Sequence, residues 1–136
     1  MSRAAPTSPS SPSPADKLDL LQGTLDLMVL QSLAALGPLH GYGIARRIEQ
    51  VGGGEILLNQ GTIYAALVRL QQGGWISADW GTSDNNRRAK FYTLTPRGEK
   101  RLAADAANWR RVANIMDRFL DASTTPPLNP NPEAAS

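Results

Sequence analysis

The sequence predicts a mainly α-helical protein with one small β-hairpin, organised as a winged helix-turn-helix domain followed by a long C-terminal dimerisation helix. Three observations predict this class. Segments with helical spacing of apolar residues occupy the first half of the chain and end at glycines. Two segments of alternating polarity then flank a basic loop. The last stretch repeats apolar residues at heptad spacing.

Three helices are expected in succession. They cover residues 22–36, 41–51 and 60–72, and each is followed by at least one glycine. Asn59 is the expected N-cap of the third helix, because its side-chain oxygen can accept a hydrogen bond from a backbone amide of the first turn. Residues 55–58 are expected to form a short extended connector before that cap.

The hairpin is expected from residues 75–80 and 90–94, which alternate in polarity and are rich in aromatic and β-branched residues. The segment between them, 81–89, is predicted to be a loop. Positive charge is concentrated here: residues 87–101 carry six basic groups and one acidic group, whereas residues 16–86 carry four basic and seven acidic groups. A charge run of this kind is either a solvated face or a surface for phosphates.

The final helix is expected to begin at Pro96, capped by Thr95, and to end near Asp121. Its apolar positions are spaced 4, 3, 4, 3, 4: Leu102, Ala106, Trp109, Ala113, Met116 and Leu120. Such a heptad seam is typical of paired helices, and the simplest partner is a second copy of the chain. The alternative is a helix that folds back on its own domain.

Domain organisation follows from these elements. Residues 16–95 are assigned to a winged helix-turn-helix DNA-binding domain and residues 96–121 to the dimerisation helix. Residues 1–15 and 122–136 are rich in serine, proline and other small or polar residues, and both are predicted to be disordered tails.

The composition excludes several classes of function. The chain has 136 residues, no cysteine and one histidine, so disulfides, thiolate metal sites and histidine clusters are excluded. His40 is assigned no chemistry, and no nucleophile has an evident base, so we expect no enzyme, metal or cofactor. No apolar run follows the N-terminal arginine, and the apolar stretch from Leu18 to Leu36 is interrupted by polar residues. A cytoplasmic protein without a membrane partner is therefore expected.

The outer face of the third helix is unusually short for a solvated face. Gly61, Ala65 and Val68 lie there beside Tyr64, with Thr62 and Arg69 on a flank. In a winged helix-turn-helix this helix enters the major groove of DNA, where long flexible side chains would obstruct its approach. Hydroxyl and guanidinium groups at these positions could reach phosphates or bases, and Gln60 could read a base. Double-stranded DNA is therefore the expected partner.

Three segments together resemble the PadR family of bacterial transcriptional regulators, and within it the acidobacterial type. They are "LLQGTLDLMVLQSLAALGPLHGYGIARRIE", "GTIYAALVRLQQGGWI" and "NNRRAKFYTLTPRGEKRL". The resemblance implies a homodimeric winged-helix regulator, usually a repressor, that binds an inverted-repeat operator. Positions that the resemblance places near DNA are Tyr42, Thr62, Tyr64, Arg87, Arg88 and Lys90.

The chain departs from the family pattern at two positions. Ala65 stands where proline is usual, and Val68 stands where a histidine or another polar residue is frequent. Val68 could contact a thymine methyl group instead. In some relatives a paired tryptophan binds flat aromatic effectors, which makes Trp109 a candidate wall of an effector pocket. Plain packing in the dimer interface is the favoured interpretation of Trp109.

The sequence thus predicts a dimeric, sequence-specific DNA-binding transcriptional regulator, most simply a repressor. Its expected DNA-binding residues are Tyr42, Gln60, Thr62, Tyr64, Arg69, Arg87, Arg88 and Lys90. The alternative is a protein-interaction adaptor that keeps the winged-helix scaffold without reading DNA. The net charge of only +2 is compatible with that alternative.

Overall fold

The computed structural model describes residues 18–19 and 22–122. The predicted tails lie outside the described residues, apart from Ala122, which is the last residue of the final helix. The chain divides into two units that meet between Leu102 and Ala103, and each unit is described by itself. The prediction of a mainly helical fold with a small sheet and a long C-terminal helix is confirmed.

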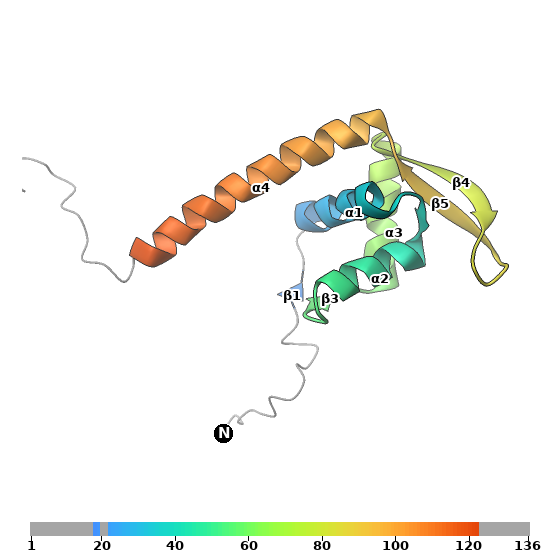
Figure 1. The fold of residues 1–136 in the computed structure, drawn as a ribbon, viewed down its shortest axis with the longest axis horizontal. Coiled ribbons are helices and arrows are strands. Elements are labelled where there is room, and N and C mark those ends of the chain that lie inside the picture. The colour runs from blue at the N-terminus through green and yellow to red at the C-terminus, as the bar shows by residue number, and fades with distance from the viewer. Residues whose placement is uncertain (1–17, 20–21, 123–136) are drawn as a thin grey trace, which may run out of the picture. The chain divides into compact units, whose positions relative to one another are not determined.

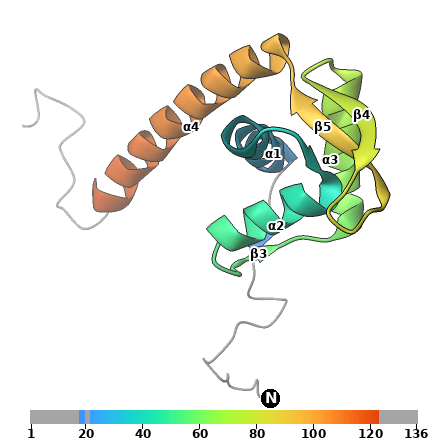
Figure 2. The ribbon, with the colours of Figure 1, turned by 45° about the vertical axis from the view of Figure 1, so that its right-hand side comes forward.

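Three helices build the core of the first unit: α1 (Gln22–Leu36), α2 (Gly41–Val51) and α3 (Gln60–Gln72). Figure 2 shows α1 almost end on, with α2 and α3 beside it. Each helix turns its apolar residues inward, because burying apolar surface is the main favourable term in folding. The fully or nearly buried helical residues are Leu25, Val29, Leu30, Leu33, Ile44, Ile48, Ile63, Ala66, Leu67 and Leu70.

Side chains cap the two helices that follow α1. Asn59 caps α3, as predicted, and its Oδ1 accepts a hydrogen bond from the Thr62 amide at 2.8 Å. His40 caps α2 in the same way, with Nδ1 accepting from the Gly43 amide at 2.9 Å. A nitrogen that accepts a hydrogen bond carries no proton, so this cap selects the His40 ring with Nδ1 unprotonated. The sequence indicated only that His40 lies near the helix start.

The sheet is larger than the predicted hairpin. Strands β4 (Ile76–Thr82) and β5 (Arg88–Leu94) pair antiparallel, and β2 (Leu39–His40) adds a third antiparallel strand beside β5. Figure 1 shows the hairpin extending from the helices of this unit. A second, two-stranded sheet pairs β1 (Leu18–Asp19) in parallel with β3 (Ile56–Leu57), within the connector that was predicted to be extended.

The predicted hairpin loop of residues 81–89 is wrong. The strands continue into it, so that Gly81 pairs with Ala89 and Thr82 with Arg88, and only residues 83–87 form the turn. The polar and small residues of this stretch are typical of a turn. The β4–β5 pairing that starts at the core nevertheless extends into it as far as Thr82 and Arg88. Within the turn, the Asn86 amide donates to the Ser83 carbonyl at 2.9 Å. Asn86 has a φ of 62°, a left-handed conformation that asparagine tolerates.

The start of α4 (Pro96–Ala122) is fastened to the sheet within the first unit. Thr95 caps this helix, since its Oγ1 accepts from the Gly98 amide at 3.0 Å and donates to the Gly74 carbonyl at 2.7 Å. Gly98 is buried, and a Cβ there would lie 2.0 Å from the carbonyl oxygen of Trp75. The helix can therefore approach the main chain at Trp75, just before β4, this closely only because residue 98 has no side chain.

In the second unit, the described residues form the rest of α4 as far as Ala122. Its large apolar side chains are exposed: Trp109, Val112, Ile115, Met116, Phe119 and Leu120. Phe119 is 70% exposed. Over the described part of the chain, no helix combines the length and the apolar character that a membrane span requires.

Candidate nucleic-acid interface

An open groove of about 780 Å³ lies between the N-terminal ends of α2 and α3 and the β4–β5 hairpin. Two helix N-termini contribute positive partial charge to it. Its charged lining residues are the cations Arg46, Arg87, Arg88 and Lys90 and the acids Glu49 and Asp84. This surface therefore combines backbone dipoles and an excess of cations, which is the character expected of a phosphate-binding surface.

At the α2 side of the groove, Tyr42 and Arg46 act as a pair. Nη1 of Arg46 donates to the Tyr42 hydroxyl at 3.2 Å, and the guanidinium carbon lies 5.8 Å from the centre of the phenol ring. The hydrogen bond to Tyr42 raises the pKa of Arg46 above its ordinary value, so the group remains a cation. Tyr42 was predicted as a DNA contact through the family resemblance, whereas Arg46 was not predicted. Their separation of four residues on a helix was the signal for the pair.

At the start of α3, Gln60 and Tyr64 are exposed and line the groove. Thr62 does not line it. The Thr62 hydroxyl donates to Oδ1 of Asn59 at 3.0 Å, so its proton is engaged in the cap. A phosphate offers only acceptor atoms, and Thr62 could therefore bind one only by giving up this bond. The expected hydroxyl–phosphate contact at Thr62 is replaced here by support of the helix start.

Tyr92 forms part of the floor of the groove and is buried, at 6% exposure. Burial raises the pKa of the Tyr92 phenol above its ordinary value of 10.0, and the nearby Tyr64 phenol raises it further. Both effects disfavour a phenolate. The floor therefore stays uncharged in the neutral pH range and does not repel phosphates.

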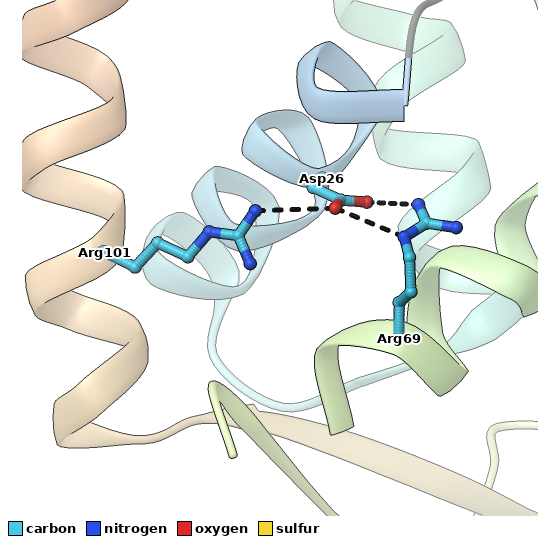
Figure 3. A network of polar contacts seen from close by, with 3 residues as sticks. All are labelled: Asp26, Arg69 and Arg101. Carbon is cyan, nitrogen blue, oxygen red and sulfur yellow. Dashed lines mark hydrogen bonds and ion pairs between the residues drawn. The ribbon is translucent and has the colours of Figure 1, made fainter. Parts of the chain in front are cut away.

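Arg69, which was expected to contact DNA, is bound to a buried carboxylate. Asp26 of α1 is only 3% exposed, and its Oδ1 accepts from Nη2 of Arg69 at 2.6 Å. Nη2 of Arg101, in the first turns of α4, lies 3.5 Å from Oδ2 of the same carboxylate. Figure 3 shows the two arginines approaching Asp26 from opposite sides. Arg69 does not line the groove, and this ion pair gives it a role in joining helices.

The hairpin supplies three cations to the groove: Arg87, Arg88 and Lys90. All three are exposed. Arg87 lies in the turn, whereas Arg88 is the first residue of β5, so the prediction that both lie at a loop tip is wrong for Arg88. The Arg88 guanidinium carbon lies 4.7 Å from the ring centre of Trp80 on the adjacent strand.

Six of the eight expected DNA-binding residues line one groove: Tyr42, Gln60, Tyr64, Arg87, Arg88 and Lys90. Of the predicted dimer seam, Leu102 packs against the core of the first unit instead. Trp109 and Met116 are exposed, while Ala106 and Ala113 are half-exposed. Within residues 18–19 and 22–122, no cluster of acidic or histidine side chains has the arrangement needed to hold a metal ion.

The fold and the cationic groove define the class of protein, a winged helix-turn-helix, DNA-binding transcriptional regulator. The model of the transcriptional regulator PadR-like family matches residues 29–104. The chain belongs to this family, whose members are transcriptional regulators rather than enzymes.

Individual relatives show the same similarity. A PadR family transcription regulator from Clostridium difficile is 28% identical, with a TM-score of 0.62 over 71% of this chain and 97% of its own. A transcriptional regulator from Clostridium thermocellum is 26% identical, with a TM-score of 0.65 over 72% and 94%. An uncharacterised protein from Lysinibacillus sphaericus is 27% identical over 103 residues, which are 76% of this chain and 94% of the relative.

Proposed function

We propose that two copies of the chain associate through the apolar face of α4 and bind an inverted-repeat operator in the cytoplasm, where the dimer represses transcription. Each copy inserts the N-terminal half of α3 into a major groove and lays the β4–β5 hairpin along the adjacent backbone. The observation that carries this proposal is the cationic groove between α3 and the hairpin. A duplex offers a row of phosphates that such cations can neutralise.

The proposed contacts follow from the groove lining. Arg46, Arg87, Arg88 and Lys90 bind phosphates, because each is a cation at the groove surface. Tyr42, Gln60 and Tyr64 contact the backbone or base edges from the two helix starts. Thr62 supports the cap of α3, and Arg69 holds α3 to α1. Neither is included among the direct contacts.

The proposed dimer is supported by the exposed apolar side chains of α4, which are costly to leave in water. Val112, Met116 and Phe119 recur at spacings of four and three residues, as helices that pair require. Two identical subunits related by a twofold axis read two half-sites, which is why the operator is expected to be an inverted repeat. We assign Trp109 to this interface and include no aromatic effector.

Selection from a pool of random-sequence duplexes tests the function. The full chain should enrich one sequence with inverted symmetry, whose half-site centres lie about 34–36 Å or a multiple of that distance apart. Placing the enriched sequence in front of a reporter gene should lower transcription when the protein is present. A protein that passes through a DNA resin at low salt and enriches no sequence would instead act as the adaptor considered as the alternative.

A further inference from the structure

Trp80 is an exposed tryptophan on the hairpin beside the groove. It lies on β4, and 60% of its surface is accessible. The large apolar face of its ring is therefore available to neighbouring groups at the groove. Neither the core nor the contacts proposed above account for Trp80.

The register of the hairpin places Trp80 among the cations. Trp80 pairs with Lys90, and Thr82 pairs with Arg88, so these four side chains lie on one face of the two-stranded ladder. The same face nearer the helices carries Ile76 and Tyr92, which are buried in the core. Trp80 therefore continues the core-facing side of the hairpin beyond the end of the core, where Arg88 and Lys90 line the groove.

Arg88 is a diagonal neighbour of Trp80 on the opposite strand, and its guanidinium lies over the indole ring. The guanidinium carbon lies 4.7 Å from the centre of the indole ring. A guanidinium held over a ring face by a cation–π contact keeps N–H donors that can bind a phosphate. An arginine that is already held in this way loses less conformational freedom when it binds.

We propose that Trp80 is a positioning residue for DNA binding, whose indole ring holds Arg88 in the orientation that binds a backbone phosphate. This inference rests on the proposed function of the groove. The occupant is the phosphodiester backbone of duplex DNA, because the cations beside Trp80 are complementary to phosphates. Trp80 acts through Arg88 and has no direct contact with the phosphate.

The test measures the affinity of the full chain for the duplex enriched by selection, at several salt concentrations. Trp80→Ala should lower affinity about two- to fivefold, the range of a cation–π contact at an exposed site. It should also reduce the salt slope toward that of Arg88→Ala, in which the slope falls by about 0.9 for each phosphate that is no longer neutralised. Trp80 carries no charge, so a reduced slope reports a change in the placement of the cations beside it, Arg88 and Lys90, and the double variant with Arg88→Ala identifies which one.

Matched variants separate this role from bulk packing and from misfolding. Trp80→Phe keeps an aromatic face and should retain most of the affinity, whereas Trp80→Leu should behave as Trp80→Ala does. The Trp80→Ala/Arg88→Ala double variant should bind no more weakly than Arg88→Ala alone. Trp80→Ala combined with Arg87→Ala should show the product of the two single losses, because Arg87 is positioned independently by the turn.

Two results would overturn the inference while leaving the proposed function intact. The first is an unchanged salt slope in Trp80→Ala, which would make the indole a simple apolar contact. The second is a double variant whose loss of affinity equals the product of the losses in Trp80→Ala and in Arg88→Ala, which would show that the two side chains act independently. If the wild-type protein enriches no duplex at all, the proposed function and this inference fail together. Thermal melting of each variant verifies that the fold is kept.

Discussion

Asp26 joins three helices through its ion pairs, a role that its position in the sequence did not indicate. Its carboxylate is buried in α1 and receives Arg69 from α3 and Arg101 from the start of α4. A buried carboxylate is costly unless it is paired, and here two cations compensate it. Three helices of the first unit are thus joined at one residue, which fixes their mutual arrangement more specifically than apolar contacts would.

Replacing Asp26 by alanine should lower the free energy of unfolding by about 3 kcal/mol. The loss is expected at the lower end of the range for buried pairs, because both arginines are partly exposed and can be rehydrated. Urea unfolding followed by circular dichroism measures it. Glu55→Ala, at an exposed carboxylate, is the matched control. Equal stability of the two variants would remove the structural role of Asp26.

The raised pKa of Tyr92 predicts a loss of stability in alkaline solution. The folded state holds the phenol proton more tightly than the unfolded state does, because burial and then Tyr64 disfavour the phenolate. Below the ordinary pKa of 10.0 both states keep the proton, and above it the unfolded chain releases it first. The free energy of unfolding should therefore fall as the pH rises above this value. Tyr92→Phe should show a shallower fall in urea titrations over the same range, and parallel curves would contradict the assignment.

At the level of elements, the helices could be predicted because their limits are encoded locally. The cap at Asn59, the proline at 96 and the glycines after the first three helices depend on neighbouring residues alone. Strand β2 could not be predicted, because two residues carry no periodicity and β2 pairs with β5 far along the chain. The length of the hairpin loop was overestimated for a related reason. Gly81 pairs with Ala89 because the preceding residues of β4 are already paired with β5, and this pairing is not visible in the local sequence.

The candidate site was predictable in part for the same reasons. Position on the third helix or in the basic segment, together with the family resemblance, identified six groove residues. The ion pair of Arg69 could not be predicted, because its partner, Asp26, lies 43 residues earlier and meets it only after α1 packs on α3. Trp80 was assigned to a strand without a site, since its contact with Arg88 depends on the cross-strand register.

The hairpin as an element should contribute affinity without sequence specificity. Arg87→Ala/Arg88→Ala should weaken binding to the selected duplex and to a scrambled duplex by similar factors, because phosphates carry no base information. The salt slope should fall by about 0.9 for each phosphate that the variant leaves without a cation. Fluorescence anisotropy at increasing salt measures both quantities.

The control for the hairpin variant removes the same charge elsewhere. Arg110 and Arg111 are exposed neighbours on α4, outside the groove. Arg110→Ala/Arg111→Ala should leave the salt slope nearly unchanged. If both double variants lowered the slope equally, overall net charge rather than the hairpin would account for binding.

For the whole molecule, the apolar face of α4 is expected to decide the assembly state. Val112→Glu/Phe119→Glu places two carboxylates on each copy at the proposed interface, where they would lose their hydration and repel those of the partner. The variant should therefore sediment as a monomer at micromolar concentration. Affinity for the selected duplex should fall at least tenfold, because two half-sites would no longer be bound by one assembly. Ala107→Glu, at an exposed position outside the predicted seam, should remain dimeric. A wild-type protein that sediments as a monomer would end this model.

The close approach at Gly98 limits how this molecule can vary. Even the methyl group of alanine would lie 2.0 Å from the Trp75 carbonyl oxygen, which belongs to the main chain and cannot turn aside as a flexible side chain would. Pro96 and Glu99, on either side of Gly98, are exposed. In a library that carries every amino acid at each of these positions and is screened for folded protein, only glycine should be recovered at position 98, whereas the exposed positions beside it should accept many residues. The close contact between the start of α4 and Trp75 therefore depends on a single codon.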